Sequence, residues 1–212
     1  FNATANGYAR GEGVGGAVIG PAGGGGADVQ ALLRATAVNQ DGRSASLTAP
    51  NGPSQQAVIN RALADAAVLP HEVAVVECHG TGTALGDPIE VDALKGTLNS
   101  GREEALVLTS AKTNIAHLEG SAGIAGFIKA SYMMSHAATP GVLHFHELNP
   151  QIDLDDFPAV IPTELRPLTV APVSGLSSFG FGGTNAHAMA YGKNTTTSRG
   201  SGQRDFRKVM RD

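Results

Sequence analysis

The chain has 212 residues and a mass of 21.6 kDa, which is the size of one domain or of a large part of one. With 42% hydrophobic and 16% charged residues it is not intrinsically disordered. A net charge of −4 and 5% aromatic residues without tryptophan argue against nucleic-acid binding, and the single cysteine excludes an intramolecular disulfide and a multi-cysteine zinc site.

The charge divides the chain into two zones. Residues 193–212 hold six Lys/Arg and two Asp/Glu, whereas residues 1–192 hold nine Lys/Arg and 17 Asp/Glu. We therefore expect a folded domain over 1–192 and a basic, disordered tail over 193–212. The start at Phe1-Asn2-Ala3 without a methionine predicts a fragment of a longer protein. No signal peptide and no apolar run of membrane-spanning length is present, so we expect a cytoplasmic location and no membrane partner.

Hydrophobic patterning predicts alternating strands and helices, and hence an α/β fold. The predicted strands cover 14–19, 31–38, 73–78, 106–109, 173–179 and 185–191. The predicted helices run from Pro53 to before Pro70, from about 87 to 98, and from about 118 to 135.

Two helix starts have particular features. Asp87, Pro88 and Glu90 fall at the cap, first and third positions of the second helix, as in a capping box. The first turns of the third helix, after His117, are almost entirely small residues. Because glycine weakens a helix by about 1 kcal/mol per site relative to alanine, this helix must pack closely against a neighbour.

Two further patterns have alternative interpretations. Gly11, Gly13 and Gly16 match the G-x-G-x-x-G fingerprint of dinucleotide binding, but no strand precedes them, so a loop feeding a strand is favoured. His144-x-His146 could place two imidazoles on one face of a strand as metal ligands. With no third ligand in the pattern, a surface strand end is favoured and we predict no metal site.

His79 and His117 lie just after or beside predicted strand ends, among small residues, and Lys112 comes five residues before His117. Ligands of open α/β folds bind outside the carboxyl ends of strands. A lone histidine there is more often structural than catalytic, but two together with a lysine indicate a site.

Five segments, in order along residues 1–191, resemble the β-ketoacyl synthase family, in particular the ketosynthase domains of modular type I polyketide synthases. His79-Gly80-Thr81-Gly82-Thr83, followed by Gly86-Asp87-Pro88-Ile89-Glu90, is similar to the first histidine motif, and Lys112–His117 with Leu118–Gly123 to the second. Ser178–His187 resembles the C-terminal gating motif. Val38–Gly42 and Ala49–Gln55 resemble segments typical of the modular enzymes.

The resemblance implies the C-terminal part of a thiolase-like fold, layered α/β/α/β/α. It also implies a decarboxylative Claisen condensation, in which a malonyl-type extender unit reacts with an acyl chain held on a cysteine. His79 and His117 would be catalytic. A developing enolate needs donors placed in advance, which two neutral imidazoles can supply. We expect His117 to stay neutral because it lies at a helix N-terminus.

The remaining roles come from the same resemblance. Lys112 is similar to the lysine that organises the histidine pair, Thr81 and Thr83 to residues that bind the phosphopantetheine arm, and Phe181 to an acyl-pocket gate. Taken alone, the two threonines would be ordinary turn hydroxyls and Phe181 a core residue at a strand end. No cofactor is expected to bind directly. The implied partners are an acyl carrier protein, other polyketide synthase domains and, in the complete domain, a second copy.

The nucleophilic cysteine of the family belongs to a segment upstream of Phe1. Cys78 does not replace it, because adjacent strand residues point to opposite faces and Cys78 and His79 cannot form a nucleophile–base pair. We interpret Cys78 as a small core residue. The prediction is thus a ketosynthase part that is inactive alone. The alternatives are a non-catalytic carrier-protein-binding or scaffolding remnant and, from the glycine fingerprint, an NAD-type binding protein.

Overall fold

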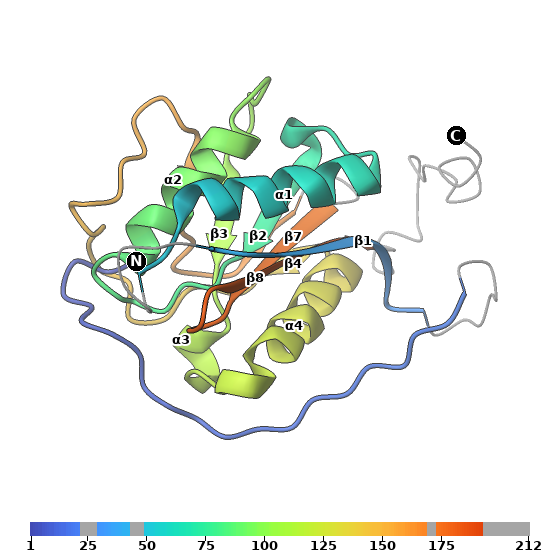
Figure 1. Ribbon diagram of the computed structural model, residues 1–212, viewed down its shortest axis with the longest axis horizontal. Helices are drawn as coiled ribbons and strands as arrows, with labels where there is room; N and C mark the ends of the chain where they lie inside the picture. Colours follow the sequence, from blue (N-terminus) through green and yellow to red (C-terminus); the bar gives the residue numbers. More distant parts are fainter. Residues whose placement is uncertain (22–28, 43–48, 169–172, 193–212) are drawn as a thin grey trace.

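The computed structural model describes residues 1–21, 29–42, 49–168 and 173–192, which form one main sheet with helices on both faces (Figure 1). The sheet has six strands in the order β1-β8-β7-β2-β3-β5. The last four are parallel, and β8 pairs antiparallel with both β1 and β7. The strands are β1 (Ala31–Gln40), β2 (Val73–Glu77), β3 (Leu106–Thr109), β5 (Ala159–Val160), β7 (Val173–Phe179) and β8 (Thr184–Gly192), while β4 (Ala138–Thr139) and β6 (Arg166–Pro167) form a separate pair.

Two helices, α1 (Gly52–Ala66) and α2 (Gly86–Leu98), cover one face of the sheet, and α4 (Ala122–His136) covers the other (Figure 1). The alternation of side chains along β2 explains the two layers. Val76 belongs to the core that includes Ile59 and Leu94, whereas Val75 belongs to the core that includes Met134. The short α3 (Lys112–Ile115) and the 3₁₀ turns η1 (Pro70–Glu72) and η2 (Glu119–Ser121) lie between the larger elements.

The start of α1 follows from its local sequence. The side chain of Asn51 caps the helix by accepting a hydrogen bond from Ser54 N at 3.1 Å, and Pro53 occupies the first turn, where its missing N–H costs nothing. The helix ends at Ala66, and Ala67 adopts a left-handed conformation. The predicted helix from Pro53 to before Pro70 is confirmed.

The small residues of α4 bring it close to the sheet, as expected. A Cβ atom on Gly126 would lie 2.8 Å from Leu176 Cδ1 in β7, so no larger residue fits there without a shift. The predicted start near Leu118 is wrong. Glu119 has a φ of 48°, which interrupts a continuous α-helix, so η2 precedes α4.

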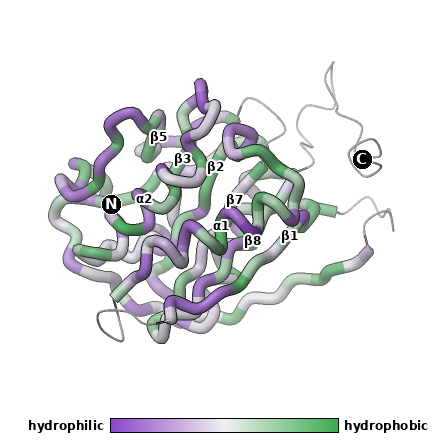
Figure 2. Tube along the Cα trace, turned by 45° about the horizontal axis from the view of Figure 1, so that its top comes forward, coloured by the Kyte–Doolittle hydropathy of each residue, from purple (hydrophilic) through white to green (hydrophobic). Residues whose placement is uncertain are grey.

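The predicted strand at 14–19 is also wrong. Residues 11–20 are extended but have no strand partner among the described residues, and Val14 and Val18 are fully exposed. The segment runs along the outside of the molecule, and Figure 2 shows hydrophobic residues within it. Gly11, Gly13 and Gly16 lie in this extended stretch, so the strand–turn–helix context of a dinucleotide site is missing.

His144 and His146 lie in a loop, which corrects the strand end predicted for them. His144 occupies a turn with a φ of 60°. Among the described residues, no group of three His, Cys, Asp or Glu side chains is arranged to hold a metal ion. None of the described helices is long and apolar enough to cross a membrane. The predicted tail, 193–212, lies outside the described residues.

Candidate active site

Two carboxylates near the start of α2 shape the loop after β2, and this loop carries His79. Glu90 accepts hydrogen bonds from the backbone N–H groups of His79 at 2.7 Å and Gly80 at 2.8 Å, and Asp87 accepts from Gly82 N at 2.9 Å. Both acids are buried. The expected capping box is therefore wrong: the acids bind the preceding loop and not their own helix, and Leu85 occupies the cap position without a side-chain hydrogen bond.

The glycines of this loop are required by its backbone. Gly80 and Gly82 have φ values of 48° and 70°, a region that side-chain-bearing residues rarely adopt. A Cβ atom on Gly82 would also lie 2.8 Å from the carbonyl oxygen of Gly7. The alternation of glycine and threonine from 80 to 83 thus lets the chain turn tightly while two hydroxyls remain on the loop.

His79 and His117 lie together, with ring centroids 5.5 Å apart and ring planes at 83°. Nδ1 of His79 accepts a hydrogen bond from Phe179 N at 3.4 Å, and Nδ1 of His117 accepts one from Glu119 N at 2.9 Å. A ring nitrogen that accepts a hydrogen bond carries no proton, so each neutral imidazole carries its proton on Nε2. The backbone therefore selects the same tautomer for both histidines.

The N-terminal segment fixes the backbone of His117. His117 N donates to Ala9 O at 2.9 Å, and Gly11 N donates to His117 O at 3.0 Å. The Tyr8 ring centroid lies 4.6 Å from that of His117. No local pattern indicates this contact, because residues 8–11 are more than 100 positions away from His117 in the sequence.

The surroundings of both imidazoles lower their pKa and so favour the neutral form. Burial, followed by the electrostatic effects of Lys112 and His117, lowers the pKa of His79 to about 3. Burial and then Lys112 lower the pKa of His117, while Glu119 acts in the opposite direction. The lowered pKa of His117 agrees with the neutral state expected for it, but the causes are burial and Lys112. A 3₁₀ turn follows this residue and not the first turn of an α-helix, so the expected cause is wrong.

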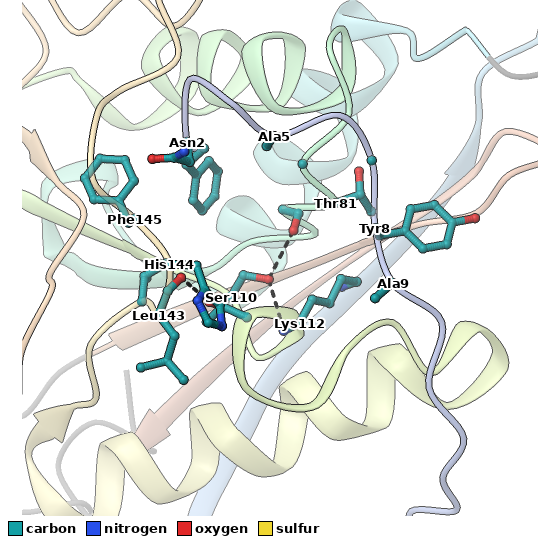
Figure 3. A pocket seen from close by; sticks show the side chains of 16 residues that line it. Asn2, Ala5, Tyr8, Ala9, Thr81, Ser110, Lys112, Leu143, His144 and Phe145 are labelled. Carbon is teal, nitrogen blue, oxygen red and sulfur yellow. Dashed lines mark hydrogen bonds between the residues drawn. The ribbon is translucent and has the colours of Figure 1, made fainter.

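Lys112 begins α3 and points toward the segment that carries Tyr8 and Ala9 (Figure 3). Burial lowers its pKa, while the carboxylates of Glu90 and Glu77 act to raise it. Within the described ranges its ammonium group has no hydrogen-bond or ion-pair partner. Lys112 lines a cavity of about 200 Å³ beside the histidine pair (Figure 3).

A larger cavity of about 490 Å³ contains the histidine pair, and Thr81, Thr83 and Phe181 also line it. The two threonine hydroxyls lie 3.3 Å apart, and Oγ1 of Thr83 accepts a hydrogen bond from Gly86 N at 3.1 Å. Thr81 borders both cavities. The structure therefore gathers all the predicted site residues except Lys112 around one cavity, with Lys112 in the adjoining one.

Phe181 lies at the tip of the turn between β7 and β8 and is 72% exposed, so it is not a core residue. The turn is tied to the end of β1, because Asp41 N donates to Gly183 O at 2.8 Å. Asn185 strengthens this tie by donating to the carboxylate of Asp41 at 2.6 Å. Asp41, Asn185 and the buried Gln55 line the larger cavity, and sequence reasoning did not select them.

A profile of the family described as "Beta-ketoacyl synthase, C-terminal domain" matches residues 30–146. The chain belongs to the β-ketoacyl synthase family. It is 48% identical over 195 residues to a phenolphthiocerol/phthiocerol polyketide synthase of Mycobacterium tuberculosis, covering 89% of this chain and 13% of that protein. It is 47% identical over 195 residues to the erythronolide synthase EryA2 of Saccharopolyspora erythraea, covering 89% of this chain and 6% of the relative.

Solved ketosynthase domains have the same fold. The structure matches an oxazolomycin ketosynthase domain of Streptomyces albus with a TM-score of 0.74 and 34% identity, over 77% of this chain and 30% of that one. It matches ketosynthase twelve of the bacillaene polyketide synthase of Bacillus amyloliquefaciens with a TM-score of 0.74 and 35% identity, over 78% and 30%. The fold is thus thiolase-like α/β, and this ketosynthase segment spans about a third of the solved domains.

The single cysteine of this ketosynthase segment is a core residue, as predicted. Cys78 is 1% exposed and its Sγ donates to Val76 O at 3.6 Å. Burial raises the pKa of the thiol well above its usual value, and nearby carboxylates raise it further. A thiol that resists deprotonation is a poor nucleophile.

Proposed function

We propose that this segment supplies the histidine half of a ketosynthase active site. That site condenses a malonyl-type extender unit with an acyl chain, each carried as a thioester on phosphopantetheine during polyketide biosynthesis. The observation that supports this proposal most strongly is that His79 and His117, two neutral imidazoles with the same tautomer, line one cavity. Two Nε2–H donors directed at one oxygen are what an enolate requires.

The chemistry divides into two bond changes. The bond between the malonyl Cα and its carboxylate breaks, carbon dioxide leaves, and the electron pair forms an enolate whose oxygen accepts hydrogen bonds from His79 and His117. The enolate carbon then attacks the acyl thioester and expels a cysteine thiolate. That cysteine comes from the upstream part of the domain, because Cys78 is buried and protonated.

Lys112 supports this reaction through its charge. A positive charge beside the pair disfavours a second positive charge on either imidazole, and it contributes to the lowered pKa of both. Lys112 thus helps to keep His79 and His117 as neutral donors at physiological pH.

The cavity wall suits a thioester on an amide-containing arm. Thr81 and Thr83 offer hydroxyl groups, and Oε1 of Gln55, although buried, has no hydrogen-bond partner among the described residues. A donor on the ligand, such as an amide N–H of phosphopantetheine, would satisfy this acceptor. Phe181, exposed at the mouth, would act as the gate.

The partners follow from family membership. We infer an acyl carrier protein, other domains of a polyketide synthase, and a second ketosynthase copy in the complete domain, all acting in the cytoplasm. No cofactor or metal is required, because the decarboxylation is driven by the loss of carbon dioxide and by enolate stabilisation.

The test uses a chimeric ketosynthase, in which residues 1–192 replace the matching segment of a ketosynthase of solved structure. Carbon dioxide release from malonyl-carrier protein is measured beside condensation product. We expect His79→Ala and His117→Ala each to lower the release by about 10²–10³-fold, the usual cost of losing one oxyanion donor. Cys78→Ala is the matched control and should leave condensation nearly unchanged.

The same assay separates this proposal from a scaffolding role. A folded chimera that binds carrier protein but neither releases carbon dioxide nor forms product, beside an active parent enzyme, would favour a non-catalytic remnant. Abolished condensation in Cys78→Ala with full decarboxylation in both histidine variants would reverse the assignment of roles.

A further inference from the structure

A buried ion pair joins the sheet to α4 behind the residues of the site. Glu77 is the last residue of β2, two positions before His79, and its carboxylate lies 2.8 Å from Nζ of Lys129 on α4. The side chains are 2% and 14% exposed. The assigned roles of the histidines, Lys112 and the threonines make no use of this pair.

The same two side chains hold the junction between β3 and α3 from both sides. The carboxylate of Glu77 accepts a hydrogen bond from the backbone N–H of Ala111, the residue directly before Lys112. Lys129 Nζ donates to Oγ1 of Thr109, the last residue of β3, at 2.6 Å. Thr109 is fully buried, so the contact is shielded from water. Two charged groups therefore act on a junction of three residues.

The packing of α4 makes room for this arrangement. A Cβ atom on Gly126 would lie 3.3 Å from Cγ of Glu77, so a larger residue on this turn of α4 would press on the glutamate. The glycine that brings α4 against the sheet thus also admits a carboxylate beneath the site.

Stability alone does not account for the pair. Removing two charges from water costs several kcal/mol per ion, and well-packed apolar residues often replace a buried ion pair without loss. Burial acts first on Glu77 and raises its pKa, while Lys129 and the Ala111 N–H oppose that shift. A costly pair whose further contacts all converge on one junction indicates a role at that junction.

We propose that Glu77 and Lys129 are a positioning pair, which sets the conformation of the β3–α3 junction and thereby the place of Lys112 beside the two histidines. The inference deepens the proposed function and rests on it. Glu77 also contributes charge, since burial lowers the pKa of Lys112 while Glu90 and then Glu77 raise it. The other ionisable groups that act on Lys112 or are acted on by it are Cys78, Asp87, His79 and His117.

Two substitutions of Glu77 in the chimeric ketosynthase separate its contributions. Glu77→Gln keeps an oxygen acceptor for Ala111 N–H but removes the negative charge, whereas Glu77→Leu removes both. Lys95→Met is the matched control, because it breaks an ion pair of 2.7 Å between Lys95 of α2 and Asp153 that lies at the surface.

Three measurements follow each variant: amide hydrogen exchange over residues 109–117, the pH midpoint of amine labelling at Lys112, and carbon dioxide release. Glu77→Leu should exchange faster over 109–117 and lose at least about tenfold in release, as small displacements of catalytic groups do. Glu77→Gln should keep slow exchange while the labelling midpoint moves to lower pH. Lys95→Met should match the unaltered protein in all three.

Unchanged exchange and full release in a folded Glu77→Leu variant would overturn the proposal. If that variant does not fold, an unshifted labelling midpoint in Glu77→Gln would overturn it instead. An unaltered chimera that releases no carbon dioxide would refute the proposed function, while exchange and labelling would still report on the positioning pair.

Discussion

Ala116, directly before His117, has a φ of 63° and a ψ of −173°. Residues with a side chain rarely adopt this conformation, which costs of order 1–3 kcal/mol and persists only where the surroundings impose it. The hydrogen bonds that residues 9 and 11 make to His117 impose it here. The strain thus accompanies the placement of the His117 imidazole, for which we propose a catalytic role.

Replacing Ala116 with glycine should relieve this strain. We expect Ala116→Gly to raise the thermal midpoint of the chimeric ketosynthase by up to a few degrees, because about 1 kcal/mol of lost backbone entropy offsets part of the gain. Ala64→Gly, at an exposed position inside α1, should lower the midpoint. Equal losses in both variants by calorimetry would contradict a strained Ala116.

His187 predicts how stability depends on pH. This residue is buried in β8, and its Nδ1 lies 3.0 Å from Oγ of Ser177. Burial lowers the pKa of His187 to about 4. An unfolded chain protonates this residue near its ordinary value of 6.5, so unfolding takes up a proton between pH 6.5 and 4. Above pH 6.5 His187 is neutral in both the folded and the unfolded chain and does not change the free energy of unfolding. As the pH falls to 4, the free energy of unfolding should decrease by about 3 kcal/mol.

Denaturant unfolding of the chimera at several pH values measures this loss. The slope of the unfolding free energy against pH gives the number of protons that unfolding takes up. His187→Gln should lower this number by about one in that pH window. Parallel slopes for the two proteins would show that His187 is not responsible.

At the level of single residues, sequence reasoning selected five residues that line the larger cavity and missed three others, Asp41, Gln55 and Asn185. Local sequence motifs made it possible to predict the five residues, which are His79, His117, Thr81, Thr83 and Phe181. Asp87 and Glu90 were assigned to the wrong task, since a helix cap and a clamp on the preceding loop use the same residue types at the same spacing. Glu77 and Asn185 act through contacts distant in sequence, which no local pattern encodes.

At the level of elements, the sequence predicted the buried strands correctly, but it did not show that residues 14–19 have no neighbouring strand to pair with. The strands at 73–77, 106–109 and 173–179 are buried over most of their length, and all were expected. Residues 14–19 have strand composition but no neighbouring strand in the described part of the chain, so they stay extended. A strand is defined by its partner as much as by its own residues.

The contact between α4 and β7 gives a prediction at this scale. Gly126→Ala should destabilise the domain by about 1–3 kcal/mol, because the new methyl group meets Leu176 at 2.8 Å. Gly120→Ala is the control, since a Cβ atom there meets nothing within 4 Å. Urea unfolding should separate the two by more than about 1 kcal/mol, and similar midpoints would show that α4 can move away from the sheet without cost.

For the whole molecule, exposed apolar residues predict poor behaviour of the isolated chain. Val14 and Val18 are fully exposed and Ile19 is 72% exposed along one extended segment. We expect residues 1–212 alone to bind the dye ANS strongly and to aggregate, whereas the chimeric ketosynthase stays monodisperse. A sharp thermal transition from a monodisperse monomer of the isolated chain would contradict this.

The hydrogen bonds from residues 1–11 have a consequence for the recombination of polyketide synthases. The family profile begins at residue 30, yet Ala9 and Gly11 fix the backbone of His117, and Gly7 N donates to Gly82 O at 2.8 Å. An exchange that begins at residue 30 would combine the histidines of one parent enzyme with residues 1–11 of the other parent. The hydrogen bonds that hold the histidine loops would then join segments of different origin. Crossovers placed upstream of Phe1 keep each histidine loop with the segment that holds it, and libraries built with the two junctions should differ in their share of active hybrids.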